Sequence, residues 1–279
     1  MSDIGFVNGR FSPLAEATVS VEDRGFQFGD GVYEVIRTYH GKLFHLDAHL
    51  ARLERSAKAL DLPMPWSLSQ WTAHVQEGVK RAGYPESKVY LQLTRGAAPR
   101  DHAFPVEPKP TVVMTVREMK PMDPAIQKAG VSVMTMDDWR WGRCDIKSVN
   151  LLPNVMARQK AKQTGAFEAL FVRDGKVTEG AVSNVMIVRA GRVLTAPEGE
   201  RILSGVTRTL VLELARKEGL PVEERFVTPD ELLNADEVFL SGTTVEVLPV
   251  VRVDGKTVGT GKPGSITQKL QAAFQRIIG

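Results

Sequence analysis

The residues that could carry chemistry centre on Lys147, within the stretch Trp139–Leu152. This lysine follows Asp145-Ile146 at the end of an extended segment and precedes a run with helical character. A lysine packed among apolar neighbours loses hydration, which lowers the pKa of its ammonium group and yields a neutral amine. A neutral amine attacks carbonyl groups and forms Schiff bases with them. Taken alone, the stretch also fits an ordinary solvated loop lysine.

Three further segments suit an aldehyde cofactor that carries a phosphate, such as pyridoxal 5'-phosphate (PLP). Gly205-Val206-Thr207-Arg208 opens an amphipathic helix, where backbone N–H groups and a hydroxyl meet the positive end of the helix dipole. Ser241-Gly-Thr243-Thr244 follows a predicted strand and offers hydroxyls in a turn. Glu179 ends another strand, where its carboxylate could pair with a protonated pyridine nitrogen. Each segment alone also fits an ordinary helix cap, turn or exposed strand end.

Other motifs fail on a required residue. Gly29-Asp-Gly31 lacks the third glycine of a dinucleotide fingerprint, because Glu34 stands in its place. The Gly255-Lys-Thr string lacks the first glycine of a P-loop. His45 and His49 share a helix face without the metalloprotease glutamate, so we expect no metal site.

Composition places the chain among ordinary soluble proteins. Its 279 residues carry a net charge of +3 with basic and acidic residues scattered, which argues against nucleic acid as a partner. A single cysteine, Cys144, excludes an intramolecular disulfide and fits a reducing compartment. No apolar run approaches the roughly 20 residues of a membrane span, and no signal peptide is visible. We therefore expect a cytoplasmic protein with no membrane partner.

The first half of the chain reads as blocks of strands and helices. Asn8-Gly9 predicts a hairpin turn, and the glycines after Asp23 predict a loop. Apolar spacing predicts helices over 46–60 and 67–82, and alternation or β-branched runs predict strands over 19–21, 32–39, 88–94 and 111–116. Prolines in Lys120–Pro124 mark a boundary.

The second half alternates a meander of short strands with helices. Helices are predicted over 151–163, 205–218 and 265–278, and strands over 131–136, 168–173, 176–179, 183–189, 192–196, 222–226, 237–240 and 246–253. The fold class is therefore α+β, with an N-terminal α+β domain over 1–119, a linker over 120–125 and a C-terminal domain over 126–279.

At this point several spaced strings, in order along the whole chain, resemble the class IV (fold type IV) PLP-dependent aminotransferases, and in particular those that act on D-amino acids. Together they are far more specific than any one of them. They are Asp23-Arg-Gly-Phe-Gln-Phe-Gly-Asp-Gly-Val-Tyr33-Glu-Val, Thr94-Arg-Gly-Ala-Ala-Pro-Arg100-Asp-His102, Arg143-Cys-Asp-Ile-Lys147-Ser, Thr178-Glu179-Gly-Ala-Val-Ser-Asn184 and Gly205-Val-Thr-Arg208.

The resemblance implies a fold with a smaller N-terminal α/β domain, a larger C-terminal domain with a barrel-like core, and PLP at the domain interface. It implies that Lys147 binds PLP as a Schiff base and carries the proton between substrate and cofactor, while Glu179 holds the pyridine nitrogen. The remaining roles implied are the phosphate contacts of Arg52, Val206, Thr207 and Thr243, and a trap for the substrate α-carboxylate made by Tyr33, Arg100 and His102.

In the resembling family Arg100 and His102 reach in from the other subunit of a homodimer, and fixing the carboxylate selects the D-enantiomer. The expected substrates are a D-amino acid of the D-alanine or D-glutamate class and a 2-oxo acid. A branched-chain L-aminotransferase and an aminodeoxychorismate-lyase-like enzyme of the same fold stay open, as does a non-catalytic scaffold. Ala181-Val182 depart from the serines expected there, which leaves the surroundings of the cofactor and the side-chain preference open.

Overall fold

The computed structural model describes residues 1–279, which divide into two compact units. Unit 1 consists of Met1–Pro121 with Ile146–Asn150, and unit 2 consists of Met122–Asp145 with Leu151–Gly279. The short segment that carries Lys147 therefore groups with unit 1, although the chain on both sides of it groups with unit 2. The domain boundaries expected from the prolines stay a prediction.

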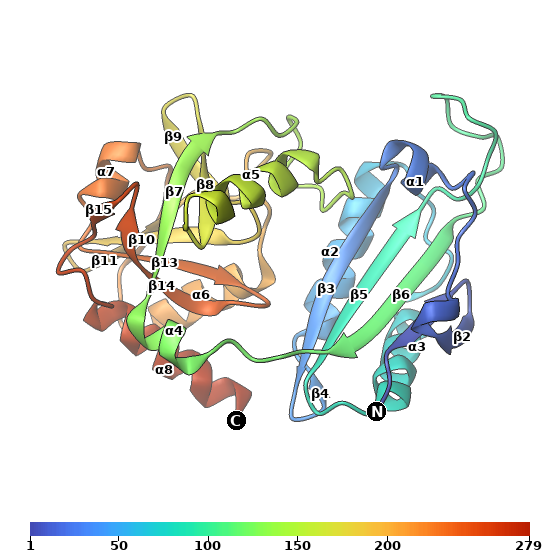
Figure 1. Cartoon of the computed structure of the whole chain (residues 1–279), viewed down its shortest axis with the longest axis horizontal. Helices are drawn as coiled ribbons and strands as arrows, with labels where there is room; N and C mark the ends of the chain where they lie inside the picture. Colours follow the sequence, from blue (N-terminus) through green and yellow to red (C-terminus); the bar gives the residue numbers. More distant parts are fainter. The chain divides into compact units, whose positions relative to one another are not determined.

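Unit 1 is built on an antiparallel sheet with the strand order β2-β1-β6-β5-β3-β4 (Figure 1). The predicted hairpin is confirmed: Asn8 and Gly9 both adopt positive φ between its strands. The strands of the whole sheet are β1 (Ile4–Val7), β2 (Arg10–Pro13), β3 (Gly31–Tyr39), β4 (Lys42–Leu43), β5 (Ser87–Thr94) and β6 (Thr111–Glu118).

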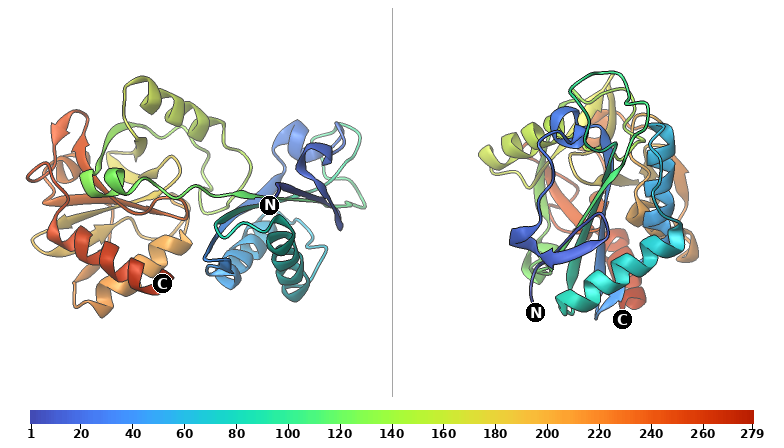
Figure 2. Two further views of the ribbon diagram at one scale, coloured as in Figure 1. Left: turned by 60° about the horizontal axis from the view of Figure 1, so that its bottom comes forward. Right: turned by 90° about the vertical axis from the view of Figure 1, so that its right-hand side faces the viewer.

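The two long helices of unit 1 cover one face of this sheet, as the left view of Figure 2 shows. They are α2 (Leu46–Ala59) and α3 (Leu68–Ala82), which confirms both helices predicted from apolar spacing. Ser67 caps α3 by accepting a hydrogen bond from the Gln70 N–H. The inward residues of both helices join the sheet in one core, in which Leu50, Leu53 and Trp71 are buried.

Two predictions in unit 1 are wrong. Residues 19–21 form no strand, and Val21 is exposed with no neighbouring strand to pair with. The glycine-rich segment contains a short helix, α1 (Arg24–Phe28), where a loop was expected. The Asp23 side chain accepts from the Gly25 N–H at its start, and Gly29 ends it at φ 70°. A 3₁₀ turn, η1 (Leu14–Glu16), was also not predicted.

Unit 2 is built on a nine-stranded sheet with the order β12-β11-β10-β13-β14-β7-β8-β9, and its last strand in sequence, β15, pairs with β14. The predicted short strands are confirmed, but they do not form one meander: β8 pairs with β9 and β10 pairs with β11, whereas β9 and β10 do not pair. The strands are β7 (Val131–Asp137), β8 (Glu168–Arg173), β9 (Lys176–Gly180), β10 (Asn184–Arg189), β11 (Arg192–Thr195), β12 (Val222–Glu224), β13 (Glu237–Gly242), β14 (Glu246–Val253) and β15 (Lys256–Thr257).

The sheet of unit 2 must curl. Strand β9 is last in the order and β10 is third, yet only residues 181–183 connect them. An isolated bridge from Val177 in β9 to Val227, just after the opposite edge strand β12, draws the two edges together. The result is the barrel-like core expected for this unit, filled by apolar side chains such as Leu170, Ile187 and Leu240.

Helices pack on both sides of this curled sheet (Figure 2). The amphipathic α6 (Val206–Lys217) and α8 (Ser265–Ile278) contact each other and β13 and β14, whereas α5 (Leu152–Gln163) packs against β8. Two short helices, α4 (Pro124–Ala129) and α7 (Pro229–Leu233), were not predicted. No helix combines the length and apolar character of a membrane span.

Candidate active site

The Lys147 segment completes the open edge of β3. The Tyr33 N–H donates to the Lys147 carbonyl at 2.9 Å, the Val149 N–H donates to the Gly31 carbonyl at 3.0 Å, and Ser148 bridges Val32. A row of free backbone groups on an edge strand is thereby paired. The Lys147 backbone N–H also donates to Ser56 Oγ at 3.2 Å. The lysine is therefore fixed at its backbone to both β3 and α2.

The half-buried Lys147 side chain lies over an aromatic ring. Its Nζ atom is 4.3 Å from the centroid of the Tyr33 ring, which stacks on Tyr90 at 5.7 Å. Burial, with a smaller contribution from the nearby Tyr33, raises the pKa of Tyr90 to about 12, so this phenol stays protonated at neutral pH. Two of the predicted site residues, Lys147 and Tyr33, are thus in contact within unit 1.

A buried ionic cluster lies beside this pair. Arg52 donates from Nε to Glu34 Oε1 at 2.7 Å and from Nη2 to Oε2 at 2.9 Å, and His49 Nδ1 lies 2.8 Å from Oε2. Burial alone would raise the pKa of Glu34, but the charge and hydrogen bonds of Arg52 outweigh it and lower the pKa to about 2. The charge of Lys147 is among the causes that lower the pKa of His49, after desolvation as the largest. The cluster is therefore within electrostatic reach of the lysine.

Arg100 and His102 lie in the exposed loop between β5 and β6. Both side chains lie against the ring of Phe28. The Arg100 guanidinium carbon is 4.9 Å from the centroid of that ring, and the centroid of the His102 ring is 5.3 Å from it. No hydrogen bond, ion pair or ring contact joins them to Tyr33 or Lys147 within one chain.

In unit 2, the buried Glu179 is surrounded by donors. The Asn184 amide donates to its Oε2 at 3.0 Å, and the Leu203 N–H lies 3.0 Å from both carboxylate oxygens. Arg140 forms an ion pair with Glu179 and a bidentate pair with Asp138 at 2.9 Å. Burial works against the charge on Arg140, but the hydrogen bonds to Asp138 and the charge of Glu179 raise its pKa. These donors hold the Glu179 carboxylate in one orientation and favour its ionised form.

The N-terminus of α6 lies against the same cluster. Gly205 caps this helix so closely to Asn184 that an added Cβ would lie 2.1 Å from the Asn184 Oδ1 atom. Val206 and Thr207 form the first helical turn, whose N–H groups have no partners inside the helix. Strand β13 pairs Ser241 with Asn184 and leads into the turn that contains Thr243.

One buried hydroxyl in this region, Ser241 Oγ, has no hydrogen-bond partner. Orphaned buried hydroxyls are uncommon in proteins, and a bound oxygen-rich group would satisfy this one. Together with the free amides of α6 and the hydroxyl of Thr207, it fits the phosphate ester of PLP. The sequence offered Ser241 as part of a hydroxyl-rich turn, but it gave no signal that this hydroxyl is buried without a partner.

Unit 2 also contains a buried carboxyl that the sequence did not reveal. Glu168 Oε1 accepts from the Val182 N–H at 2.7 Å, while Oε2 has no partner. Burial raises the pKa of Glu168. Ala181-Val182 are the residues that stand where serines were expected. The bond from Val182 to Glu168 and the 2.7 Å hydrogen bond from the Asn154 amide to the Ala181 carbonyl hold them in place.

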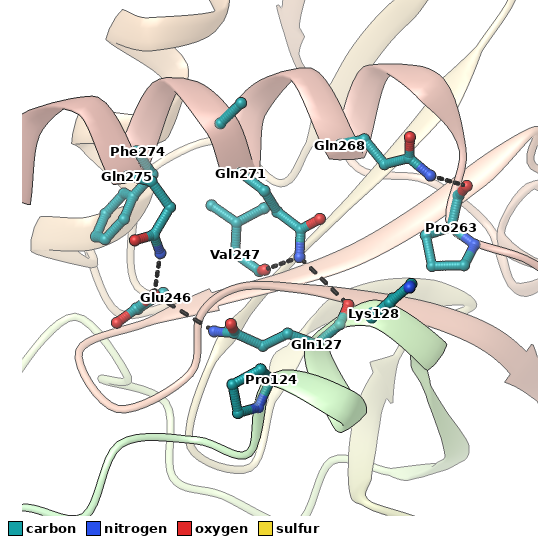
Figure 3. Close-up of a pocket in the computed structure, with 11 residues that line it drawn as sticks. Pro124, Gln127, Lys128, Glu246, Val247, Pro263, Gln268, Gln271, Phe274 and Gln275 are labelled. Carbon is teal, nitrogen blue, oxygen red and sulfur yellow. Dashed lines mark hydrogen bonds between the residues drawn. The ribbon is translucent and has the colours of Figure 1, made fainter.

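A separate pocket of about 600 Å³ lies among α4, α8 and the start of β14 (Figure 3). Its glutamine side chains are engaged locally: Gln271 donates to the Val247 carbonyl at 3.1 Å, and Gln268 donates to the Pro263 carbonyl at 3.0 Å. The pocket contains none of the predicted site residues.

Comparison with known proteins places the chain among aminotransferases. The family model described as amino-transferase class IV matches residues 31–253. A "D-alanine aminotransferase" of Bacillus licheniformis is 48% identical over 272 residues, which cover 97% of this chain and 95% of that protein. A protein of the same name from Staphylococcus haemolyticus is 42% identical over 98% of this chain and 97% of its own length.

Solved structures with the same fold include branched-chain enzymes. The branched-chain amino acid aminotransferase of Escherichia coli superposes with a TM-score of 0.93 at 26% identity, over 100% of this chain and 95% of that chain. The branched-chain aminotransferase of the archaeon Thermoproteus uzoniensis gives a TM-score of 0.90 at 29% identity, over 99% and 94%. These matches confirm the predicted class IV, fold type IV architecture, and the chain belongs to the class IV aminotransferase family.

Proposed function

We propose that this protein is a PLP-dependent D-amino-acid aminotransferase, which transfers an amino group between a D-amino acid of the D-alanine or D-glutamate class and a 2-oxo acid. The observation that carries the proposal is the 48% identity to a D-alanine aminotransferase along nearly the whole chain. Identity to the two branched-chain enzymes of the same fold is only 26% and 29%.

Bound PLP supplies an aldehyde that condenses with amines and a ring that withdraws electrons from the substrate. Lys147 would provide the amine that holds the cofactor, and the same amine would accept and release the proton at the substrate Cα. Its fixed backbone and its position over Tyr33 support this role, because a proton carrier must be held at a set place.

Glu179 would hold the protonated pyridine nitrogen, and its donors support this assignment by keeping an anionic carboxylate in place. Val206, Thr207 and Thr243 would hold the phosphate from unit 2, and the partnerless Ser241 hydroxyl fits beside them. Arg52 would add a cation to the same phosphate while its Nε and Nη2 atoms remain on Glu34.

Tyr33, Arg100 and His102 would bind the substrate α-carboxylate, since a guanidinium and an imidazole are suitable donors for it. Arg100 and His102 are exposed and do not contact Lys147 in their own chain, which supports their acting in a second subunit. Helix α5 also exposes the apolar side chains of Leu152, Val155 and Met156, as an interface helix would. We therefore propose a homodimer, to be checked by light scattering on the purified protein.

The decisive experiment is reduction of the holoenzyme with borohydride, followed by peptide mapping. We expect the cofactor to be fixed on Lys147, and we expect Lys147→Ala to abolish turnover. Lys88→Ala, which removes an exposed lysine of unit 1, is the control and should keep full activity. A label on any other lysine would overturn the mechanism.

The structural likeness to branched-chain enzymes favours one competing function, an L-selective branched-chain transaminase. A donor screen with both enantiomers of alanine, glutamate and leucine separates the two. Activity with L-leucine above that with D-alanine would replace the proposal. Cytoplasmic location stays a prediction, consistent with the buried free thiol of Cys144.

A further inference from the structure

The loop that carries Arg100 and His102 has little structure of its own. Between β5 and β6 this loop forms only one isolated bridge, from Ala97 to Asp23. The side chains of Arg100 and His102 are exposed. A long loop without secondary structure needs tertiary anchors to hold a side chain in a set place. Residues elsewhere in unit 1 must therefore fix this loop at positions 100–103.

The main anchor is Arg24, the first residue of the unpredicted helix α1. Its buried guanidinium donates from Nη1 to the Asp101 carbonyl at 2.5 Å and to the Ala103 carbonyl at 3.2 Å, and from Nη2 to the His102 carbonyl at 3.2 Å. A planar fork of donors that binds three consecutive carbonyls fixes the orientation of that stretch as well as its position.

A second anchor acts on the side chains themselves. Phe28 lies one turn after Arg24 on α1, and its ring contacts the guanidinium groups of both Arg24, at 4.8 Å, and Arg100, at 4.9 Å. The His102 ring lies 5.3 Å from the same ring. Phe28 is thus a shared platform for the two residues assigned to the carboxylate.

Asp30 ties these anchors to the body of unit 1. It accepts from Arg24 Nε at 2.8 Å and from Arg95 Nε at 2.8 Å. Arg95 is itself buried and donates to the carbonyls of Leu60, at 2.8 Å, and Asp61, at 3.0 Å, just after α2. The loop is therefore connected to the helix that also carries His49 and Arg52.

We propose that Arg24 and Phe28 are positioning residues that place Arg100 and His102 for the substrate carboxylate and thereby set the preference between amino acid enantiomers. This proposal rests on the proposed role of Arg100 and His102. Neither Arg24 nor Phe28 touches the substrate in it; both act through the loop.

The test compares Arg24→Met, Arg24→Lys and Phe28→Leu holoenzymes with the unmodified holoenzyme. We expect Arg24→Met to raise the KM for D-alanine about tenfold, and kcat to change by less than about threefold, because the loss falls on substrate placement. The ratio of D-alanine to L-alanine turnover should fall. Arg24→Lys keeps the charge without the planar fork of donors, so its KM should lie between those of the unmodified enzyme and Arg24→Met. Phe28→Leu should raise the KM less than Arg24→Met does.

A readout independent of activity reports the loop directly. Hydrogen exchange of the peptide spanning residues 96–106 should be faster in Arg24→Met, and trypsin should cleave after Arg100 sooner. Arg37→Met is the matched control, since Arg37 is another buried arginine of unit 1 with a carboxylate partner, Glu86, and a ring partner, Tyr39. It should lower thermal stability without changing the KM for D-alanine or exchange in the loop.

The two levels of the proposal fail in different ways. If Arg100→Met leaves the KM for D-alanine unchanged, the carboxylate role itself is wrong. If Arg100→Met raises the KM but Arg24→Met changes neither the KM nor the exchange of residues 96–106, the positioning role alone is wrong. An equal rise of KM in Arg37→Met would reduce the effect of Arg24 to general destabilisation and would also overturn the proposal.

Discussion

Glu34 in unit 1 and Glu168 in unit 2 are both completely shielded from solvent, at 0% exposure, yet their pKa values move in opposite directions. Glu34 faces the Arg52 fork and His49, and its pKa falls to about 2. Glu168 accepts from the Val182 N–H but has no cation bonded to it, and burial raises its pKa. The same side chain, equally buried, is therefore held as an anion in one unit, whereas in the other burial works against its charged form.

This difference shows that the partners of a buried carboxyl, and not its burial, decide its charge. The anionic Glu34 holds two cationic or polar side chains near Lys147. Glu168 instead holds the backbone of the connection between β9 and β10, where it accepts from the Val182 N–H.

The largest expected effect comes from removing the cation in unit 1. Arg52→Met leaves Glu34 buried without its compensating charge, and we expect the free energy of unfolding of the holoenzyme to fall by about 3–5 kcal/mol. Equilibrium urea unfolding measures it. Adding Glu34→Gln should restore part of the loss, because the uncompensated charge is then gone. A loss below about 1 kcal/mol would contradict the account of this pair.

The acid side of the stability profile provides a second, smaller effect. The folded pKa of Glu34, about 2, lies below its ordinary value of 4.5, so the unfolded chain binds more protons between these values. The stabilisation is therefore present above pH 4.5 and is lost as the pH falls towards 2. It amounts to about 3 kcal/mol. Unfolding measured at several acid pH values should show a shallower slope in Glu34→Gln, and an unchanged slope would assign the acid sensitivity to other groups.

The smallest effect is expected at Glu168. Its folded pKa is raised, so its contribution is fully present below the unfolded pKa and is lost as the pH rises through the folded pKa. Glu168→Gln keeps an oxygen for the Val182 N–H and cannot ionise, so stability at acid pH should change by less than about 1 kcal/mol. The melting temperature of the variant should fall less at alkaline pH than that of the unmodified protein. A large loss at acid pH would show that the carboxyl has a role beyond accepting this bond.

Much of the architecture could be predicted from the sequence, because long elements carry their pattern locally. The apolar spacing of α2 and α3 and the β-branched runs of β5 and β6 needed no distant information. The short helices were missed for a different reason. Asp23 and Gly29 are ordinary signals for the start and end of α1, but the surrounding glycines favoured a loop.

The site was less accessible to sequence reasoning. Lys147 and Glu179 were predicted as site residues from the motifs that contain them. Glu34, Arg140 and Glu168, by contrast, carry no local sequence signal that they are buried and hydrogen-bonded. Arg140 meets Glu179 only because the barrel-like sheet brings their segments together. The loop anchor Arg24 contacts carbonyls that lie 77 to 79 residues further along the chain, a separation that no periodicity encodes.

The pairing of the Lys147 segment with β3 also has a consequence for synthesis of the chain. Unit 1 lacks five of its residues until Ile146–Asn150 have left the ribosome, after part of unit 2 has already emerged. Until then the Tyr33 N–H and the Gly31 carbonyl lack their native partners. A fragment that ends at Pro121 would keep these groups unpaired permanently, so the unit cannot be excised as one continuous piece without losing both an edge of its sheet and the reactive amine.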